Sequence, residues 1–487
     1  MKMTQDDEGE KHVPTGISGL DRILIGGYPA GRIMLVEGAP GTGKTTLALQ
    51  FLIEGARRGK KAMFFSIAQS HLELDMIAES HGFDMSQVDT LTPELGHDGS
   101  SRVFSVDSDQ ADLVGLMDEL NRELDKHKPD LFVFDSLLEL RLLTQQETHY
   151  RRELLALRRK LREIGCTSLL VDHLEPQWGE RNAEGIVHGV IKLDSVTPPI
   201  GVVRQRLTVT KLRGAPFVQG YHDFRIGTGG MVVYPRVIPK DAEPVTMEEM
   251  LEPSHDGLRD MLGGGLEFGS TLLIAGQSGT GKSTLATVLA SDAGKRGLTS
   301  AMFLFEERTA VLRQRSRQVG IELAEQEEHG RVLLQHFDPA ELSTGEFSNA
   351  VLSAVNEGAR VIVIDSLSGY LEALPDQSHA LIHLHTLIKH LAMREVLVIV
   401  TISQSGLLGE PPATQLNSSF IADSVILLRQ YESNSEIRRS IAVLKKRQGD
   451  HLRNIQELVI RPGAVEIRHV SAETEKRTKS ESTLGGS

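Results

Sequence analysis

Residues 38–45 have the sequence GAPGTGKT, and residues 276–283 have the sequence GQSGTGKS. Both match G-x-x-x-x-G-K-[S/T], a pattern in which glycines let backbone N–H groups converge on phosphate oxygens at the start of a helix. Each match follows a short apolar run and precedes a stretch with helical periodicity, as a phosphate loop requires. Two such matches in one chain predict two nucleotide sites.

The chemistry of this motif gives each loop residue a role. Lys44 and Lys282 are expected to reach the β- and γ-phosphates, and the hydroxyls of Thr45 and Ser283 are expected to bind Mg²⁺. Lys282 is also a predicted catalytic residue. The residues predicted to hold ATP are Gly41, Thr42, Gly43, Lys44, Thr45 and Thr46 in the first loop, and Gly279, Thr280, Gly281, Lys282, Ser283 and Thr284 in the second. ATP and Mg²⁺ are therefore the expected cofactors.

Outside the loops, the two halves of the chain continue to resemble each other. Residues 16–45 align with residues 254–283, and LFVFDS at 131–136 aligns with VIVIDS at 361–366. A repeat of this length indicates a duplicated domain, because solenoid repeats are far shorter.

Each copy alternates short apolar runs with helical stretches. Runs that are apolar on both faces and separated by helices indicate a mostly parallel sheet. The predicted strands are Ile33–Val36, Ala62–Ile67, Leu131–Phe134 and Ser168–Val171 in the first copy, and Leu272–Ala275, Ala301–Phe305, Val361–Ile364 and Val396–Ile402 in the second. The predicted fold class is α/β, with two tandem phosphate-loop domains that each have a mostly parallel central sheet flanked by helices.

Composition changes mark the expected domain boundaries. The first domain is placed at 12–238 and the second at 251–470, with a polar, acidic linker at 239–250 between them. The tail at 471–487 has no apolar periodicity, so it is expected to be disordered.

Two aspartates end apolar runs in corresponding places. Asp135 and Asp365 follow the strands predicted downstream of each phosphate loop. A carboxylate at the carboxyl end of such a strand can meet the Mg²⁺ shell, so both are predicted metal ligands.

The copies differ in the two residues that follow the first predicted strand after each phosphate loop. The second copy has Glu306 and Glu307 there, whereas the first has Ala68 and Gln69. A carboxylate in this place can orient water, or a hydroxyl, for attack on the γ-phosphate. Glu306 and Glu307 are therefore predicted catalytic residues, and Glu306 is also a predicted metal ligand. On this basis the second site is expected to perform chemistry and the first chiefly to bind nucleotide.

Cations stand near the end of each copy. Lys211 and Arg213 end the first domain, and Lys445 and Arg447 have similar places in the second. Such cations can cross a subunit interface and stabilise a neighbour's transition state, as arginine fingers do. All four are predicted catalytic residues, with plain surface charge as the alternative.

Bulk properties limit the other classes of function. The chain has 487 residues, a formal net charge of −13 and a single cysteine, Cys166. The acidic balance disfavours nucleic acid and anionic membranes as partners, since both require a positive field. One cysteine cannot form an intramolecular disulfide, and no apolar run reaches the roughly 20 residues of a membrane span. A cytoplasmic protein is expected.

Together these motifs resemble the KaiC family of the RecA/DnaB ATPase superfamily. The resemblance covers roughly residues 12–465 and includes KLRG at 211–214 and the stretch at 422–447. It implies RecA-like domains and a homo-hexameric double ring of a circadian clock or other signalling protein, with ATP between neighbouring subunits. It also implies an ATPase in the N-terminal ring, and serine/threonine autokinase and autophosphatase activity in the C-terminal ring. Lys211, Arg213, Lys445 and Arg447, with His451, would act in trans, and a KaiB-like protein would be a partner.

Two departures separate this chain from the clock members of that family. The acidic pair of the first domain is replaced by Ala68 and Gln69. The adjacent serine and threonine acceptors of the family align with Ser419 and Phe420, so Ser419 is the first candidate phosphoacceptor and Ser418 the second.

Two other functions fit the same motifs. One is a recombination or helicase motor of the RecA/DnaB type, which would need a DNA channel. The other is a nucleotide-gated scaffold with little turnover, which the loss of the acids at Ala68 and Gln69 favours.

Overall fold

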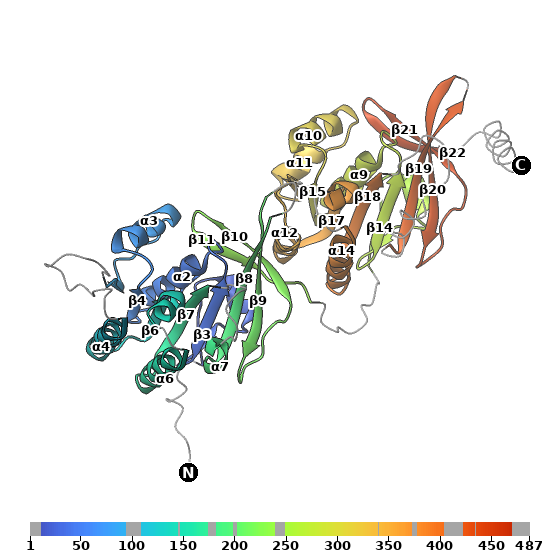
Figure 1. The fold of residues 1–487 in the computed structure, drawn as a ribbon. Helices are drawn as coiled ribbons and strands as arrows, with labels where there is room; N and C mark the ends of the chain where they lie inside the picture. The colour runs from blue at the N-terminus through green and yellow to red at the C-terminus, as the bar shows by residue number, and fades with distance from the viewer. Residues whose placement is uncertain are drawn as a thin grey trace, which may run out of the picture. The chain divides into compact units, whose positions relative to one another are not determined.

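A nine-stranded sheet forms the centre of each half of the chain in a computed structural model (Figure 1). The chain divides into two units, Met1–Arg236 and Val237–Ser487. The structure describes residues 11–93, 109–144, 147–173, 182–197, 202–238, 249–338, 340–372, 377–403, 422–433 and 435–469.

Unit 1 alternates strands and helices as far as β8. Its strands are β1 (His12–Val13), β2 (Tyr28–Pro29), β3 (Ile33–Gly38), β4 (Ala62–Ser66), β5 (Val88–Leu91), β6 (Leu131–Asp135), β7 (Thr167–His173), β8 (Gly189–Val196), β9 (Arg204–Leu212), β10 (Tyr221–Gly227) and β11 (Gly230–Tyr234). Its helices are α1 (Ser18–Ile23), α2 (Lys44–Arg57), α3 (His71–His81), α4 (Asp109–His127), α5 (Leu137–Leu142), α6 (Glu147–Glu163) and α7 (Asn182–Ile186).

The large sheet of unit 1 has the order β11-β10-β9-β8-β3-β7-β6-β4-β5. Strands from β8 to β5 pair in parallel, and β9, β10 and β11 extend the sheet antiparallel. Alternate residues of β3 enter different cores, since side chains alternate between the faces of a strand. Met34 and Val36 pack in the core that includes α2, and Ile33 and Leu35 in the core that includes α4 and α6. Helices therefore cover both faces.

Unit 2 repeats this plan. Its strands are β12 (Met250–Leu251), β13 (Leu266–Glu267), β14 (Thr271–Gly276), β15 (Thr299–Leu304), β16 (Val332–His336), β17 (Ala359–Asp365), β18 (Leu397–Ser403), β19 (Ser424–Ser433), β20 (Glu436–Lys446), β21 (Gln456–Arg461) and β22 (Ala464–His469). Its helices are α8 (Asp256–Met261), α9 (Lys282–Lys295), α10 (Thr309–Gln318), α11 (Leu323–Glu328), α12 (Thr344–Asn356), α13 (Leu367–Glu372) and α14 (Gln377–Ala392). The order β16-β15-β17-β18-β14-β19-β20-β21-β22 matches that of unit 1.

The predicted fold class is confirmed, and each predicted strand is present. Strands β3, β4, β6 and β7, and their counterparts β14, β15, β17 and β18, form the parallel centre of each sheet. The antiparallel strands beyond β8 and β19 were not predicted individually. Their mixed burial explains this, because β9 carries only three buried residues among nine.

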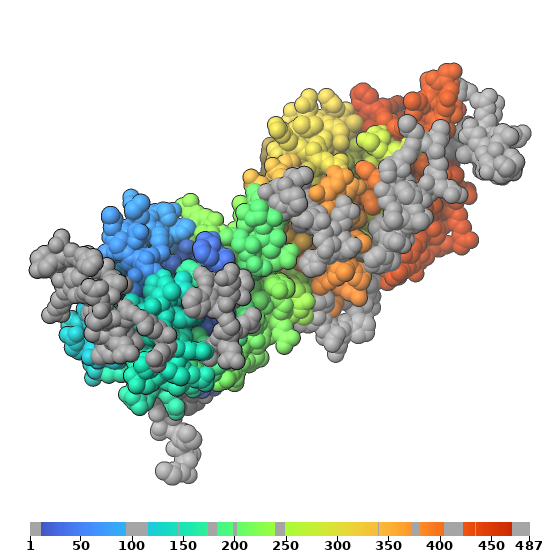
Figure 2. Space-filling view, in the orientation of Figure 1, coloured from blue at the N-terminus to red at the C-terminus, as the bar shows by residue number. Residues whose placement is uncertain are grey.

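The surface of unit 1 includes α3, which is blue in Figure 2. Leu72 and Met76 of this helix are 70% and 62% exposed. In the described part of the chain, no helix is both long and apolar enough to cross a membrane.

Unit 1 buries a set of charges beside its phosphate loop. Lys192 lies 3.5 Å from Glu37 and 2.8 Å from Glu184, and Arg141 lies 2.6 Å from Asp172. Burial raises the pKa of Glu37 to about 7, with Lys192 opposing the shift and Glu184 and Asp172 adding to it. The folded state therefore holds a proton on Glu37 that the unfolded state releases near pH 4.5.

We predict that Glu37→Gln removes a pH dependence from the stability of unit 1. Folded Glu37 binds its proton more tightly than unfolded Glu37, so wild-type stability falls as pH rises from about 4.5 to about 7. Between these pH limits, the free energy of unfolding of the variant should rise by about 2 kcal/mol relative to that of wild type. Thermal unfolding of the full chain, with hydrogen exchange followed in β3, measures the difference. Parallel pH profiles for the two proteins would contradict the prediction.

Candidate functional site

The first phosphate loop turns around its own lysine. Gly43 has a φ of 89° and precedes α2, which begins at Lys44. The Lys44 ammonium donates to the carbonyl oxygens of Gly38 at 2.8 Å and Ala39 at 2.9 Å. A side chain at Gly43 would be strained, because L residues rarely adopt this φ, and its Cβ atom would lie 2.2 Å from the Ile226 Cδ1 atom, which would have to shift. The loop is thus shaped as phosphate binding requires, with backbone N–H groups at a helix start.

The second loop has the same geometry. Gly281 has a φ of 102°, α9 begins at Lys282, and the Lys282 ammonium donates to the Gln277 carbonyl oxygen at 2.9 Å. Burial lowers the pKa of Lys282, while Asp365 and Glu306 oppose the shift. Two carboxylates therefore lie within electrostatic reach of the phosphate-loop lysine.

The predicted metal-binding pairs meet in both units. Thr45 donates a hydrogen bond of 2.8 Å to Asp135, and Ser283 donates one of 3.1 Å to Asp365. Thr401 of β18 also donates to Asp365. Hydroxyl and carboxylate oxygens are the hard ligands that Mg²⁺ prefers, so the residues present fit this ion.

The other predicted loop residues divide into two groups. Gly41 and Gly279 have positive φ angles, and the hydroxyls of Thr42 and Thr280 hold the turn by donating to loop carbonyls. Thr46 and Thr284 are buried near the starts of their helices, and Thr284 also lines a cavity at the second loop. The Thr46 hydroxyl lies 3.4 Å from the His81 Nε2 atom.

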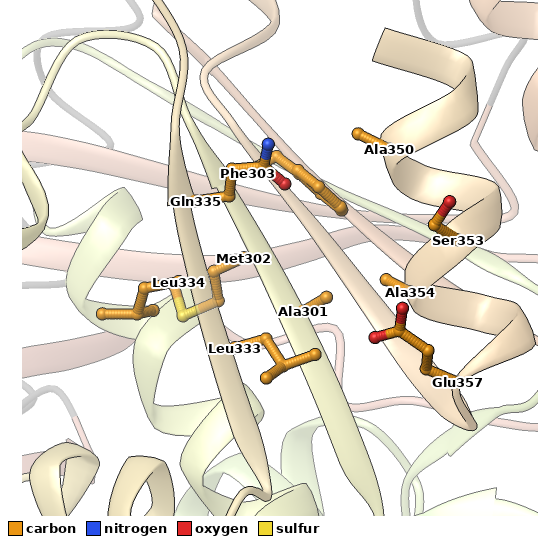
Figure 3. Close-up of a pocket in the computed structure, with 10 residues that line it drawn as sticks. All are labelled: Ala301, Met302, Phe303, Leu333, Leu334, Gln335, Ala350, Ser353, Ala354 and Glu357. Carbon is orange, nitrogen blue, oxygen red and sulfur yellow. The ribbon is translucent and has the colours of Figure 1, made fainter. Parts of the chain in front are cut away.

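A cavity of about 630 Å³ opens at the second loop. Its charged lining residues are Lys282, Glu306, Glu307, Arg308, Arg315, Asp365 and Arg439. A separate cavity of about 400 Å³ lies between β15, β16 and α12, as Figure 3 shows. Glu357 is the one charged residue among those lining it, so the chemistry-bearing groups gather at the phosphate loop.

The two predicted catalytic acids of unit 2 have different partners. Glu306 accepts a hydrogen bond from Ser366, the residue that follows Asp365. Glu307 forms an ion pair of 2.9 Å with Arg315, and burial raises its pKa against the influence of that arginine. The arrangement leaves Glu306 beside the lysine and the aspartate of the site, while Arg315 engages Glu307.

Unit 1 places an unpredicted acid at its phosphate loop. Ala68 is exposed, and the backbone N–H of Gln69 donates to Ser66 at 3.0 Å. Glu139 of α5 accepts a hydrogen bond from Ser136, which follows Asp135. Sequence reasoning missed Glu139 because it searched only the positions that match Glu306 and Glu307.

Two of the four predicted trans-acting cations occupy equivalent strand positions, and Arg213 and Arg447 directly follow those strands. Lys211 pairs with Val190 across β8 and β9, as Lys445 pairs with Val425 across β19 and β20. The ammonium of Lys211 donates to the Glu184 carbonyl, and that of Lys445 donates to the Ala422 carbonyl at 2.7 Å.

Within one chain, Lys211 and Lys445 lie toward the starts of β3 and β14, and the loops follow the other ends of these strands; this end of each sheet is called the domain edge. Arg213 and Arg447 are exposed, and His451 is half-buried. Arg447 lies 3.4 Å from Asp423. Among the described residues, neither Lys445 nor Arg447 lines the cavity at the second loop. A role at their own subunit's nucleotide has no support in this geometry.

Two further points concern candidates beyond these. Ser418 and Ser419 lie outside the described residues. Arg439 of β20 was not predicted, although its guanidinium donates to the Gly279 carbonyl at 3.2 Å and lines the second cavity. No motif predicts Arg439, because it is far from the loop in the sequence and is brought beside it only by the pairing of the strands.

Comparisons with known proteins agree with this geometry. The family model of the KaiC ATPase matches residues 13–238 and again residues 255–471. The chain is 27% identical over 467 residues to the circadian clock protein KaiC3 of Synechocystis sp., covering 94% of this chain and 91% of that protein. It is also 27% identical to the circadian clock oscillator protein KaiC of Prochlorococcus marinus, covering 94% and 90% of the two chains. With both halves matched and both phosphate loops formed, this chain belongs to the KaiC family of ATPases.

Proposed function

We propose that the protein is a hexameric KaiC-like signalling ATPase that binds Mg·ATP at both loops and modifies its own serine. The observation that carries the ATPase proposal is the cluster of Lys282, Ser283, Asp365 and Glu306 around one cavity. Relatives named as circadian clock proteins support a signalling role.

The residues of the second site have separate tasks in hydrolysis. Lys282 neutralises charge on the β- and γ-phosphates, and the backbone N–H groups of the loop hold their oxygens. Mg²⁺, held by Ser283 and Asp365, would supply further positive charge to those phosphates. Glu306 orients a water molecule and accepts its proton as the water oxygen bonds to the γ-phosphorus. The bond to the bridging oxygen breaks, and ADP and phosphate leave.

The ring proposal rests on the cations at the domain edges. Lys211, Arg213, Lys445 and Arg447 carry positive charge outside the second loop's cavity and at matched positions in the two units. A neighbouring subunit's nucleotide would give this charge a partner. In a closed ring each subunit would complete the site of the next.

We predict that ATP assembles the chain into a hexamer. Nucleotide phosphates should neutralise the edge cations of the neighbouring subunit, which removes repulsion across the interface. Light scattering with a non-hydrolysable ATP analogue should give the mass of six chains, and Arg213→Ala with Arg447→Ala should weaken assembly. A wild-type monomer at saturating nucleotide would overturn the ring proposal.

We predict that Glu306 contributes more to turnover at the second site than Glu307. In a Lys44→Ala background, Glu306→Gln should lower phosphate release by about a hundredfold, because glutamine cannot accept a proton. Glu307→Gln should have a much smaller effect, since Arg315 already engages that acid. Glu328→Gln, on the exposed end of α11, is the matched control. Equal losses from both variants would contradict the assignment.

We propose Ser419 as the acceptor of an autokinase reaction, with Ser418 second. Ser419 precedes β19 closely in the sequence, and β19 begins beside the start of β14, whose other end leads into the phosphate loop, so a neighbouring subunit's nucleotide would be the phosphate donor. In that transfer the serine oxygen would bond to the γ-phosphorus, its proton would pass to a carboxylate, and ADP would leave. A KaiB-like protein is the proposed partner that senses the result.

We predict that incubation with Mg·ATP phosphorylates Ser419. Phosphopeptide mapping should find this phosphate in wild type and in Ser418→Ala, and lose it in Ser419→Ala. Phosphate confined to tail serines such as Ser480 or Ser482 would contradict the acceptor assignment. A chain that hydrolyses ATP and carries no phosphate would refute the autokinase.

A further inference from the structure

Equivalent serines of the two units each contact a carboxylate, and a different element supplies that carboxylate in each unit. The backbone fixes the equivalence, because Ile67 N–H donates to the Asp135 carbonyl and Phe305 N–H donates to the Asp365 carbonyl, both at 2.9 Å. The serine after each aspartate is buried and donates to an acid. In unit 2 this acid is Glu306, at the end of β15. In unit 1 it is Glu139, on α5.

The position that matches Glu139 in unit 2 is Gly369. A Cβ atom there would lie 2.8 Å from the Phe305 Cβ atom, 3.3 Å from the Glu306 Cγ atom and 3.7 Å from the Glu306 Oε1 atom. A side chain at 369 would thus enter the space that Glu306 occupies. In unit 1 the short side chain of Ala68 leaves that space free for Glu139. In each unit, the space beside the buried serine holds one carboxylate, which comes from a strand end in unit 2 and from a helix in unit 1.

The charge of Glu139 acts on the phosphate-loop groups of unit 1. Burial lowers the pKa of Lys44, and Asp135, Asp172 and Glu139 oppose that shift. Lys282 of unit 2 is influenced in the same way by Asp365 and Glu306. Glu139 therefore accepts a hydrogen bond from the equivalent serine and lies within electrostatic reach of Lys44, as Glu306 does of Lys282.

Helix capping is the ordinary alternative for a serine followed three residues later by a glutamate. Unit 1 contains a complete capping box at α3, where Glu73 N–H donates to Ser70 Oγ and Ser70 N–H donates to Glu73. At α5 the Ser136 side chain makes no bond to a helix N–H group. Its hydroxyl donates to Glu139 instead, so the pair orients the carboxylate.

We propose that Glu139 is the carboxylate that activates water at the first nucleotide site. This rests on the proposed binding of Mg·ATP there, and it replaces the expectation that the first site chiefly binds. The water oxygen bonds to the γ-phosphorus, the bond to the β–γ bridging oxygen breaks, and ADP and phosphate leave. The proton of the water passes to Glu139.

The test uses the full chain with Glu306→Gln and Glu307→Gln, which silences the second site and keeps its loop. Residual phosphate release should vanish with Lys44→Ala, which assigns that release to the first site. Adding Glu139→Gln should lower it by about a hundredfold or more. Binding of a fluorescent ATP analogue and hexamer mass should not change, because glutamine keeps the volume and still suits a capping box. Exposed Glu163→Gln on α6 is the matched control.

Moving the carboxylate provides a second measurement. Glu139→Gly alone should lose turnover, and Glu139→Gly with Ala68→Glu should restore it by copying the arrangement of unit 2. A simple capping role predicts a lower melting temperature for Glu139→Gly and no rescue of turnover by Ala68→Glu.

Three outcomes separate the proposals. Residual release that survives Glu139→Gln but not Lys44→Ala overturns the role of Glu139 and leaves the ATPase proposal standing. No residual release at all in the background chain also overturns it, since the first site would then not hydrolyse ATP. A wild-type chain that neither binds nor hydrolyses ATP overturns the proposed function itself.

Discussion

One hydrogen bond joins each phosphate loop to a strand that is not its neighbour. Thr45 donates to Asp135, and Ser283 donates to Asp365, although β7 separates β3 from β6 and β18 separates β14 from β17. The bond can form only if the inserted strand is in place and all three strands run parallel. Their carboxyl ends then lie at one edge of the sheet, where ligands of such folds bind. Sheet order, helix starts and the acid beside each serine all depend on this arrangement.

The parts of the site that sequence predicted are those set by local geometry. A glycine with positive φ, a lysine at a helix start and an acid at the end of an apolar strand each follow from residue type and spacing, so both loops and Asp135 and Asp365 were found. Glu139 and Arg439 were not, because their places depend on which strands and helices pack together. The antiparallel strands were missed for a related reason: their half-exposed faces carry no continuous apolar run.

The two copies have also diverged in the core behind the loop. Three charged residues of unit 1 stand where the strand register of unit 2 has apolar ones: Glu37, Asp172 and Lys192 against Ala275, Ile402 and Leu427. Buried charges cost desolvation energy that their pairing offsets only in part, so stability alone does not explain them. Asp172 also acts on Lys44. Three acids of unit 1, Asp135, Asp172 and Glu139, therefore act on Lys44, whereas two acids of unit 2, Asp365 and Glu306, act on Lys282.

The carboxylates of the two units lie beside equivalent serines, although their positions in the sequence do not align. In the proposed hydrolysis, an acid lies beside the buried serine and within electrostatic reach of the loop lysine, and a strand end or the first turn of a helix can supply it. The two sources exclude each other, because Phe305 and Glu306 leave no room for a side chain at Gly369. Ala68, which carries no carboxylate, is thus compatible with Glu139 on α5 in unit 1. An alignment of the two copies that compares single columns shows that an acid is missing at Ala68, but it does not show that Glu139 lies beside the same serine.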